Sequence, residues 1–142
     1  MSMQNIPVMD CGDGIVRAQT GVVRAPVAKT AAYQILASDA GTTFTNAGAS
    51  GSVTFTLPLS DLTTNPPRRI TGMRFRFVKY ADQNLIIAVG TGAKINNGTA
   101  STGVFRNVTG LSSNWPMCEL EAISETEWIV TNIGASGTWA NA

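Results

Sequence analysis

Two glutamates stand two residues apart in the segment MCELEAI, residues 117–123. In a β-strand, residues at i and i+2 point to the same face and lie about 7 Å apart. This separation suits the two carboxylates of an inverting glycosidase, in which one is the general acid and the other activates water. A solvated strand face shows the same spacing, because outward-facing polar residues alternate with apolar ones there. We favour the solvated face for Glu119 and Glu121 and predict that the chain is not an enzyme.

Other residues that carry reactions or bind metals are scarce. The chain has no histidine, which removes the commonest general base, the histidine-activated nucleophiles and the imidazole metal ligands. Cys11 and Cys118 form no C-x-x-C unit. They can pair in space, but we expect two unpaired thiols that behave as small apolar side chains. The segment DCGDG, residues 10–14, has two acidic side chains, fewer than a calcium loop supplies, so we predict no metal and no cofactor.

The segment RRITGMRFRFVKY, residues 68–80, is a local run of cations with aromatic side chains between them. Binding to nucleic acid needs the cations and the rings on one face. Strand alternation separates them, since Arg74 and Arg76 point one way and Phe75 and Phe77 the other. The formal net charge of the chain is +1, too small to attract a polyanion from a distance. We expect a core strand whose basic outer face can meet an acidic protein surface, and no nucleic-acid partner.

The composition is that of a folded domain with few charges. A length of 142 residues suits one domain with one core. Hydrophobic residues make up 44% and charged residues 13%, the opposite of the balance in disordered chains. The N-terminus lacks the pattern of a secretory signal, and the longest apolar run, LIIAV at 85–89, is too short to cross a bilayer. We expect synthesis in the cytoplasm, no membrane association, and a partner protein that covers part of the surface.

Alternation of apolar and polar residues recurs along the chain at the spacing of short strands. It predicts an all-β fold, specifically an antiparallel, jelly-roll-like β-sandwich. The segment GTTFTNAGASGSVTFTLP, residues 41–58, predicts a hairpin with Phe44 on one strand and Val53, Phe55 and Leu57 on the inner face of the other. The glycines and the asparagine of its NAGASG loop suit a turn.

Turn signals divide the rest of the chain. The Asn97-Gly98 pair predicts another hairpin, and SETE, residues 124–127, predicts a solvated turn that contains Glu125 and Glu127. Residues 61–70 contain two prolines and two arginines and predict a surface excursion. Further strands are expected within residues 72–80, 83–90, 103–108, 117–123 and 128–133.

The chain divides into an N-terminal arm and one domain. Residues 1–30 alternate poorly, and we interpret them as an arm or a pair of edge strands loosely attached to a β-sandwich of residues 31–142. Trp128 begins a strand and is expected in the core, and Trp139 is expected to pack against a neighbouring strand. Trp115 precedes a proline in a loop, where it could contact a glycan or an interface.

The order of these motifs resembles a module of tailed-bacteriophage virion proteins. The similarity is carried by residues 41–58, 74–98 and 125–139 and spans about residues 33–139. The module has a Thr-Phe-x-Asn-x-Gly-Ala hairpin leading to Leu-Pro, then Phe-x-Phe and Asn-Leu-x-Ile strands and a Gly-rich turn with Ile. A closing Trp-x-Val strand follows, and after it Gly-Thr-Trp. The matching positions here are Phe44, Asn46, Gly48, Ala49, Leu57, Pro58, Phe75, Phe77, Asn84, Leu85, Ile87, Ile95, Trp128, Val130, Gly137, Thr138 and Trp139. This chain departs from the pattern at residues 59–72 and in its N-terminal arm.

The resemblance implies a virion structural protein. Similar modules occur in tail fibres and spikes, where they bind receptors or glycans, and similar small β proteins decorate capsids. Because this chain begins at its own Met and stops after one module, we expect a capsid decoration or cement protein that sits on the virion surface. Such proteins resemble small sandwiches that bind an assembled shell as dimers or trimers, so the expected partners are the major capsid protein and further copies of the chain. A receptor-binding or glycan-binding tail module remains the alternative.

The arm offers a way to hold a neighbouring protein. An extended segment can add a strand to a neighbour's sheet, with apolar side chains as anchors and cations that meet acidic groups. We therefore predict that residues 1–30 contact the capsid. The predicted contact residues are Ile15, Val16, Arg17, Val22, Val23 and Arg24.

Overall fold

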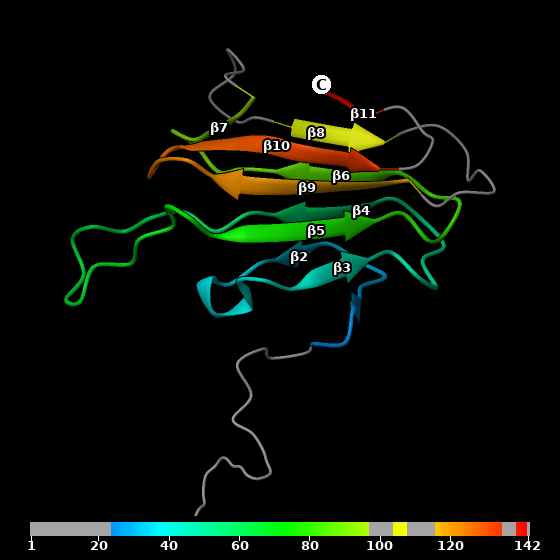
Figure 1. Ribbon diagram of the computed structural model, residues 1–142. Coiled ribbons are helices and arrows are strands. Elements are labelled where there is room, and N and C mark those ends of the chain that lie inside the picture. Colours follow the sequence, from blue (N-terminus) through cyan, green and yellow to red (C-terminus); the bar gives the residue numbers. More distant parts are fainter. Residues whose placement is uncertain (1–23, 97–103, 108–115, 135–138, 142) are drawn as a thin grey trace, which may run out of the picture.

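The computed structural model describes residues 24–96, 104–107, 116–134 and 139–141 (Figure 1). These residues are mostly strands with a single short 3-10 helix, so the prediction of an all-β fold is confirmed. The helix η1 spans Ala37–Asp39. The strands are β1 (Val27–Ala28), β2 (Tyr33–Gln34), β3 (Thr43–Thr45), β4 (Val53–Thr56), β5 (Arg74–Val78), β6 (Leu85–Ala88), β7 (Lys94–Ile95), β8 (Val104–Asn107), β9 (Met117–Ala122), β10 (Glu127–Gly134) and β11 (Trp139–Asn141).

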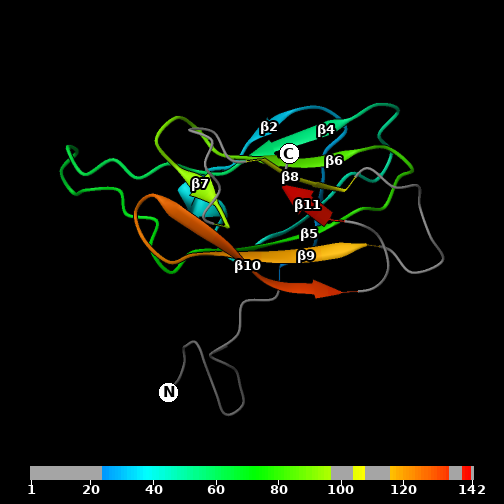
Figure 2. The same cartoon turned by 90° about the horizontal axis from the view of Figure 1, so that it is seen from above.

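The strands form two sheets, between which the chain alternates. Sheet A has the order β1-β3-β5-β9-β10-β7, and sheet B has the order β11-β8-β6-β4-β2. From β1 to β9, each strand lies in the other sheet from the one before it, as Figures 1 and 2 allow the reader to follow. The first six strands therefore stack as successive coils, each with one strand in each sheet.

This winding sets the direction of strand pairing. A chain that returns to the same sheet after one full coil runs parallel to the strand it joins, and β1–β3, β3–β5, β2–β4 and β4–β6 are all parallel, as is β7–β10. The pairs β5–β9, β9–β10, β6–β8 and β8–β11 are antiparallel. The predicted antiparallel arrangement is therefore wrong for five of these strand pairs.

The hairpin predicted over residues 41–58 is wrong for the same reason. β3 lies in sheet A and β4 in sheet B, so the NAGASG segment crosses between sheets instead of closing a hairpin. The rings of Phe44 and Phe55, expected to lie on the inner side of one hairpin, instead meet across the core with their centroids 5.3 Å apart. Likewise, the strands on either side of Asn97-Gly98, β7 and β8, lie in different sheets, so the hairpin predicted at this pair is also wrong; the pair itself lies outside the described residues.

Asn46 fixes the turn that leaves β3. Its side chain is fully buried, and its Oδ1 accepts hydrogen bonds from the backbone N–H groups of Tyr80 and Ala81 at 2.6 and 2.9 Å. Its amide group donates to the carbonyl oxygens of Ala81 and Gln83 at 3.3 and 3.2 Å. One side chain thus ties the turn after β3 to the turn after β5, the equivalent point of the next coil.

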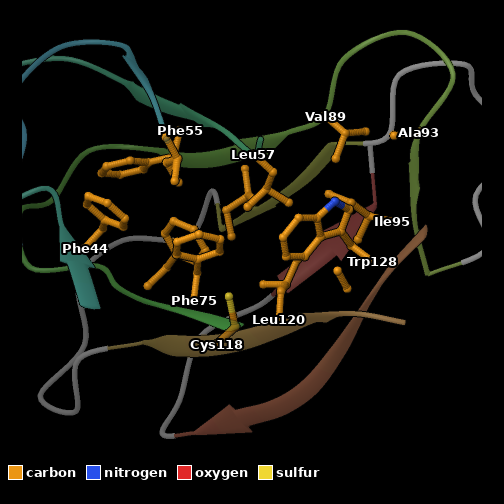
Figure 3. Close-up of a cluster of buried hydrophobic side chains, with 14 of the residues drawn as sticks. Phe44, Phe55, Leu57, Phe75, Val89, Ala93, Ile95, Cys118, Leu120 and Trp128 are labelled. Atoms are coloured by element: carbon orange, nitrogen blue, oxygen red, sulfur yellow. The ribbon is translucent and has the colours of Figure 1, made fainter. Parts of the chain in front are cut away.

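The core lies between the two sheets and is built from the alternate residues of each strand (Figure 3). Val53, Phe55 and Leu57 are buried as predicted, and so are Phe75 and Phe77. The other buried apolar residues are Ile35, Phe44, Ile70, Leu85, Ile87, Val89, Ala93, Ile95, Cys118, Leu120, Ala122 and Trp128. The prediction that Trp128 belongs to the core is confirmed, and Trp139 packs against the core from β11.

Two further segments can be compared with the sequence predictions, the SETE turn and the start of the described chain. The SETE turn joins β9 to β10 as an antiparallel pair, as predicted. At the start of the described chain, Val27–Ala28 of the predicted arm forms β1 and pairs with β3 at the edge of sheet A. β1 is thus an edge strand, whereas residues 1–23 of the predicted arm lie outside the described residues, so the division into an arm and a domain stays a prediction.

Candidate interaction surface

The two glutamates with glycosidase spacing form a charge ladder with β5. Glu121 Oε1 lies 3.2 Å from Arg74 Nη2, and Glu119 Oε2 lies 3.6 Å from Arg76 Nη2, across the β5–β9 pair on the outer face of sheet A. A hollow of about 190 Å³ lies beside Glu119, but Glu121 does not line it. The two carboxylates therefore do not share this hollow, and each lies beside an arginine guanidinium. This geometry favours the solvated strand face over the catalytic pair.

Most of the predicted contact residues lie outside the described part of the chain. This applies to Trp115 and to five of the six predicted capsid contacts, namely Ile15, Val16, Arg17, Val22 and Val23. Arg24 is exposed, and its Nη1 donates a hydrogen bond of 3.4 Å to Thr42 Oγ1, just before β3. Cys11 and the DCGDG segment also lie outside the described residues, whereas Cys118 is a buried free thiol.

The segment predicted as a surface excursion, residues 61–70, belongs to a long loop that extends away from the two sheets. After β4 the chain crosses to sheet A through residues 59–70, which project beyond the sheets in both views (the green loop in Figures 1 and 2). Asp61 and Arg68 face each other as a β-bridge, with two backbone hydrogen bonds of 2.8 Å. We call residues 61–68 the finger. The prediction of a surface excursion is confirmed, since residues 62–69 are all exposed.

The finger is held by its own side chains. The hydroxyl group and the backbone N–H of Thr63 donate to Asp61 Oδ1 at 2.6 and 3.1 Å, and these bonds lower the pKa of Asp61 from its ordinary value. The hydroxyl group of Thr64 lies 3.0 Å from the carbonyl oxygens of both Asp61 and Pro66. The Arg68 guanidinium donates to the carbonyl oxygen of Leu59 at 3.0 Å. Although it is exposed, the finger therefore has a defined shape.

Glu125 fastens the base of the finger to the turn between β9 and β10. Its Oε2 accepts a 2.6 Å hydrogen bond from the hydroxyl of Thr71, and its Oε1 accepts one of 3.0 Å from the N–H of Ile70. These two bonds, with a smaller contribution from Arg69, hold the pKa of Glu125 below its ordinary value. The interpretation of Glu125 as a merely solvated turn residue is wrong, because its partners are more than fifty positions away in sequence.

A groove of about 370 Å³ opens where the finger begins. We call it the Leu59 groove; its lining comprises Gln34, Ile35, Leu36, Ala37, Thr56, Leu57, Pro58, Leu59, Arg68 and Gly90. These residues come from three successive points at which the chain leaves sheet B, after β2, β4 and β6. Gly90 lets the groove form its present wall, since a Cβ there would lie 2.7 Å from Cδ1 of Leu59.

Two side-chain donors at this groove, the Gln34 amide and Arg68 Nε, are already engaged. The Gln34 amide nitrogen donates to the carbonyl oxygens of Ile35 and Thr56 at 3.1 and 3.2 Å, and Arg68 Nε donates to Leu59. A sugar-binding groove needs such donors and acceptors free to meet hydroxyl groups. The Leu59 groove is therefore better suited to apolar contact than to a glycan.

Apolar side chains are exposed together around the finger and the groove. Leu36, Leu59 and Leu62 have exposed fractions of 54, 38 and 51%. Leucines of this exposure are ordinary when scattered, but a cluster beside a groove is typical of a protein-binding surface. One signal for this surface is visible in the sequence, an apolar residue at position 62 within a run of turn-forming residues, and that signal is too local to show the groove.

Comparison with known proteins does not assign the chain to a family. No family model matches the chain, and no curated protein matches it. Within the described part of the chain, no three histidine, cysteine or acidic side chains come together as a possible metal site. The described residues also contain no helix long and apolar enough to cross a membrane. The resemblance to bacteriophage virion modules stays a prediction.

Proposed function

We propose that the chain is a capsid decoration or cement protein, a virion structural protein that binds the outside of an assembled bacteriophage head and bridges subunits of the major capsid protein. The observation that carries this proposal is the position of β1. This strand forms the edge of sheet A, and no described strand pairs with its outer side. The predicted arm leads directly into it, so an extended segment reaching a neighbouring protein would continue from an open sheet edge.

The chemistry of the described surface supports a binding role without catalysis. The carboxylates of β9 are paired with arginines, and the carboxylate of Glu125 accepts a hydrogen bond from the backbone of Ile70. A cement protein needs several weak contacts made at once, because bridging two or three subunits raises the effective concentration of each further contact. Binding only to the assembled shell then stabilises the shell by mass action. In this proposal the protein is made in the host cytoplasm and functions in the virion.

We also propose that the two sheets form a β-sandwich, although without the strand pairing of a jelly roll. Two sheets that share one core support a sandwich. The parallel pairing of the first six strands is unlike the antiparallel strands of jelly rolls and follows from the coiled path of the chain.

Deletion of residues 2–23 tests the role of the arm. The cut spares β1 and Lys29, whose backbone N–H donates to Thr45 at 2.9 Å and whose ammonium lies 3.7 Å from the ring centroid of Tyr33. We expect the shortened protein to keep its circular-dichroism spectrum and to lose co-sedimentation with heads that lack the native protein. Undiminished co-sedimentation would overturn the role of the arm.

Point variants within the arm provide a matched comparison. An Ile15→Asp/Val16→Asp double variant places two charges at predicted apolar anchors, whereas Gln19→Asp/Thr20→Asp places the same two charges at residues that were not predicted to make contact. We expect the first to weaken head binding and the second to leave it unchanged. Equal effects would mean that the arm acts through its charge alone.

Copy number separates the proposed function from its alternative. Quantitative mass spectrometry of purified particles should find hundreds of copies if the protein decorates the head. A handful of copies would identify a tail-fibre or spike module, for which receptor or glycan binding is the expected role.

A further inference from the structure

We propose that the finger and the Leu59 groove form a self-complementary interface, through which two copies of the chain associate about a two-fold axis. In this dimer Leu62 of each copy enters the Leu59 groove of the other. The proposal does not depend on capsid binding, because it concerns the protein alone in solution.

The finger and the Leu59 groove lie on one patch of the surface. Arg68 closes the finger and also lines the groove, and Leu59 lines the groove two residues before the finger begins. A two-fold interface uses the same patch on both copies, so that patch must contain both complementary parts. A finger that rises from the rim of an apolar groove meets this condition, and a second copy supplies both missing parts at once.

The finger is already ordered before a partner binds. Binding through a flexible loop loses affinity because the loop must be ordered. Here the Asp61–Arg68 bridge, the Thr63 and Thr64 hydroxyl groups and the Glu125 anchor already define the loop. The backbone of Leu62, directly after the bridge, is therefore held in place before any partner arrives, and its side chain is half exposed.

The patch also carries one charge of each sign. Asp61 and Arg68 stand together, with a carboxylate-to-guanidinium distance of 3.9 Å, and their side chains are 34 and 48% exposed. A two-fold axis brings the same patch in the opposite direction, so each charge can face its opposite in the other copy. A partner with a surface of one sign would meet one favourable and one unfavourable charge instead.

Sedimentation equilibrium of the full chain tests the association. We expect a concentration-dependent dimer for the native protein. Leu62→Lys should raise the dissociation constant by about 30-fold or more, the effect of losing a central anchor. Ile133→Lys is the matched control, because Ile133 is also 51% exposed but lies opposite Cys118, toward the other end of the strands.

A second variant probes the groove. Leu36→Asp places a charge in the groove wall, at the N-cap position of η1, where aspartate is favoured, so the variant should fold. Alone it should also be monomeric. An equimolar mixture of Leu36→Asp and Leu62→Lys should recover a dimer, because one native finger-in-groove contact remains and the introduced lysine faces the introduced aspartate in the other.

Three results would overturn the proposal. The first is a native protein that stays monomeric at a concentration of about 0.2 mM, well above the dissociation constants of specific interfaces. The second is equal dissociation by Ile133→Lys, which would place the contact elsewhere. The third is a mixture that stays monomeric, which would mean that Leu62 and Leu36 do not meet. None of these results bears on head binding, which co-sedimentation measures separately.

Discussion

Replacement of Asn46 by alanine is the sharpest test of how the coils are held together. The side chain is fully buried and makes four hydrogen bonds to the backbone of residues 80–83, one coil further along. Alanine keeps the backbone of the turn after β3 and removes all four bonds. The N–H groups of Tyr80 and Ala81 then lose the acceptor that satisfies them.

The expected cost follows from these bonds. The two shorter ones, at 2.6 and 2.9 Å, contribute about 1 kcal/mol each, and leaving a buried donor without a partner adds roughly 1 kcal/mol more. We therefore expect Asn46→Ala to lower the free energy of unfolding by about 3 kcal/mol. With an m-value of about 2 kcal/mol/M, the urea midpoint falls by roughly 1.5 M.

Urea unfolding at one fixed protein concentration measures this loss, followed by circular dichroism and tryptophan fluorescence. Asn132→Ala is the control, since Asn132 is exposed on β10 and surface substitutions of this kind change stability by about 0.5 kcal/mol or less. A midpoint for Asn46→Ala that matches the control would refute the view that this side chain ties the coils together.

Asn46→Asp adds a test that general loss of packing would not pass. The aspartate keeps acceptors for Tyr80 and Ala81 but cannot donate to the carbonyl oxygens of Ala81 and Gln83 while it is ionised. Protonation restores one donor, so the folded state should bind the proton more tightly than the unfolded state. The stability difference from the native protein should therefore shrink as pH falls toward about 4, the ordinary range of an aspartate, and should level off below that range. A difference that stays constant with pH would contradict this account.

Three further predictions concern other parts of the fold. Because the pKa of Glu125 is lowered in the folded state, its contribution to stability is present above its ordinary value of 4.5 and is lost as pH falls through the folded value. The exchange rate of the Ile70 amide, divided by the rate of an unstructured peptide at the same pH, should rise over that range, and Glu125→Gln should remove this pH dependence. Burial raises the pKa of the Cys118 thiol well above its ordinary value, so in a Cys11→Ser background Ellman's reagent should label it only after unfolding. Phe44→Ala should cost about 3–5 kcal/mol in urea unfolding, since its ring contacts four other aromatic rings, and a cost below about 1 kcal/mol would contradict the central place of this ring in the core.

Local sequence patterns predicted only part of the candidate interaction surface. The prolines and arginines of residues 61–70 correctly indicated an exposed loop. They did not show that Leu62 stands beside a groove, because the groove is assembled from Leu36, Leu59 and Gly90 at three separate crossovers. They also did not show that Glu125 anchors the loop, since that contact joins residues far apart in the chain.

The sequence by itself determined which side of each strand is buried. Alternation at period two is a local property, and it correctly placed Phe55, Phe75 and Phe77 in the core. Only the tertiary structure decided which sheet each strand joins. A six-residue segment such as NAGASG can close a hairpin or cross the roughly 10 Å between packed sheets equally well. The crossing is stabilised by the hydrogen bonds of Asn46 to a turn more than thirty residues away, which no local pattern records.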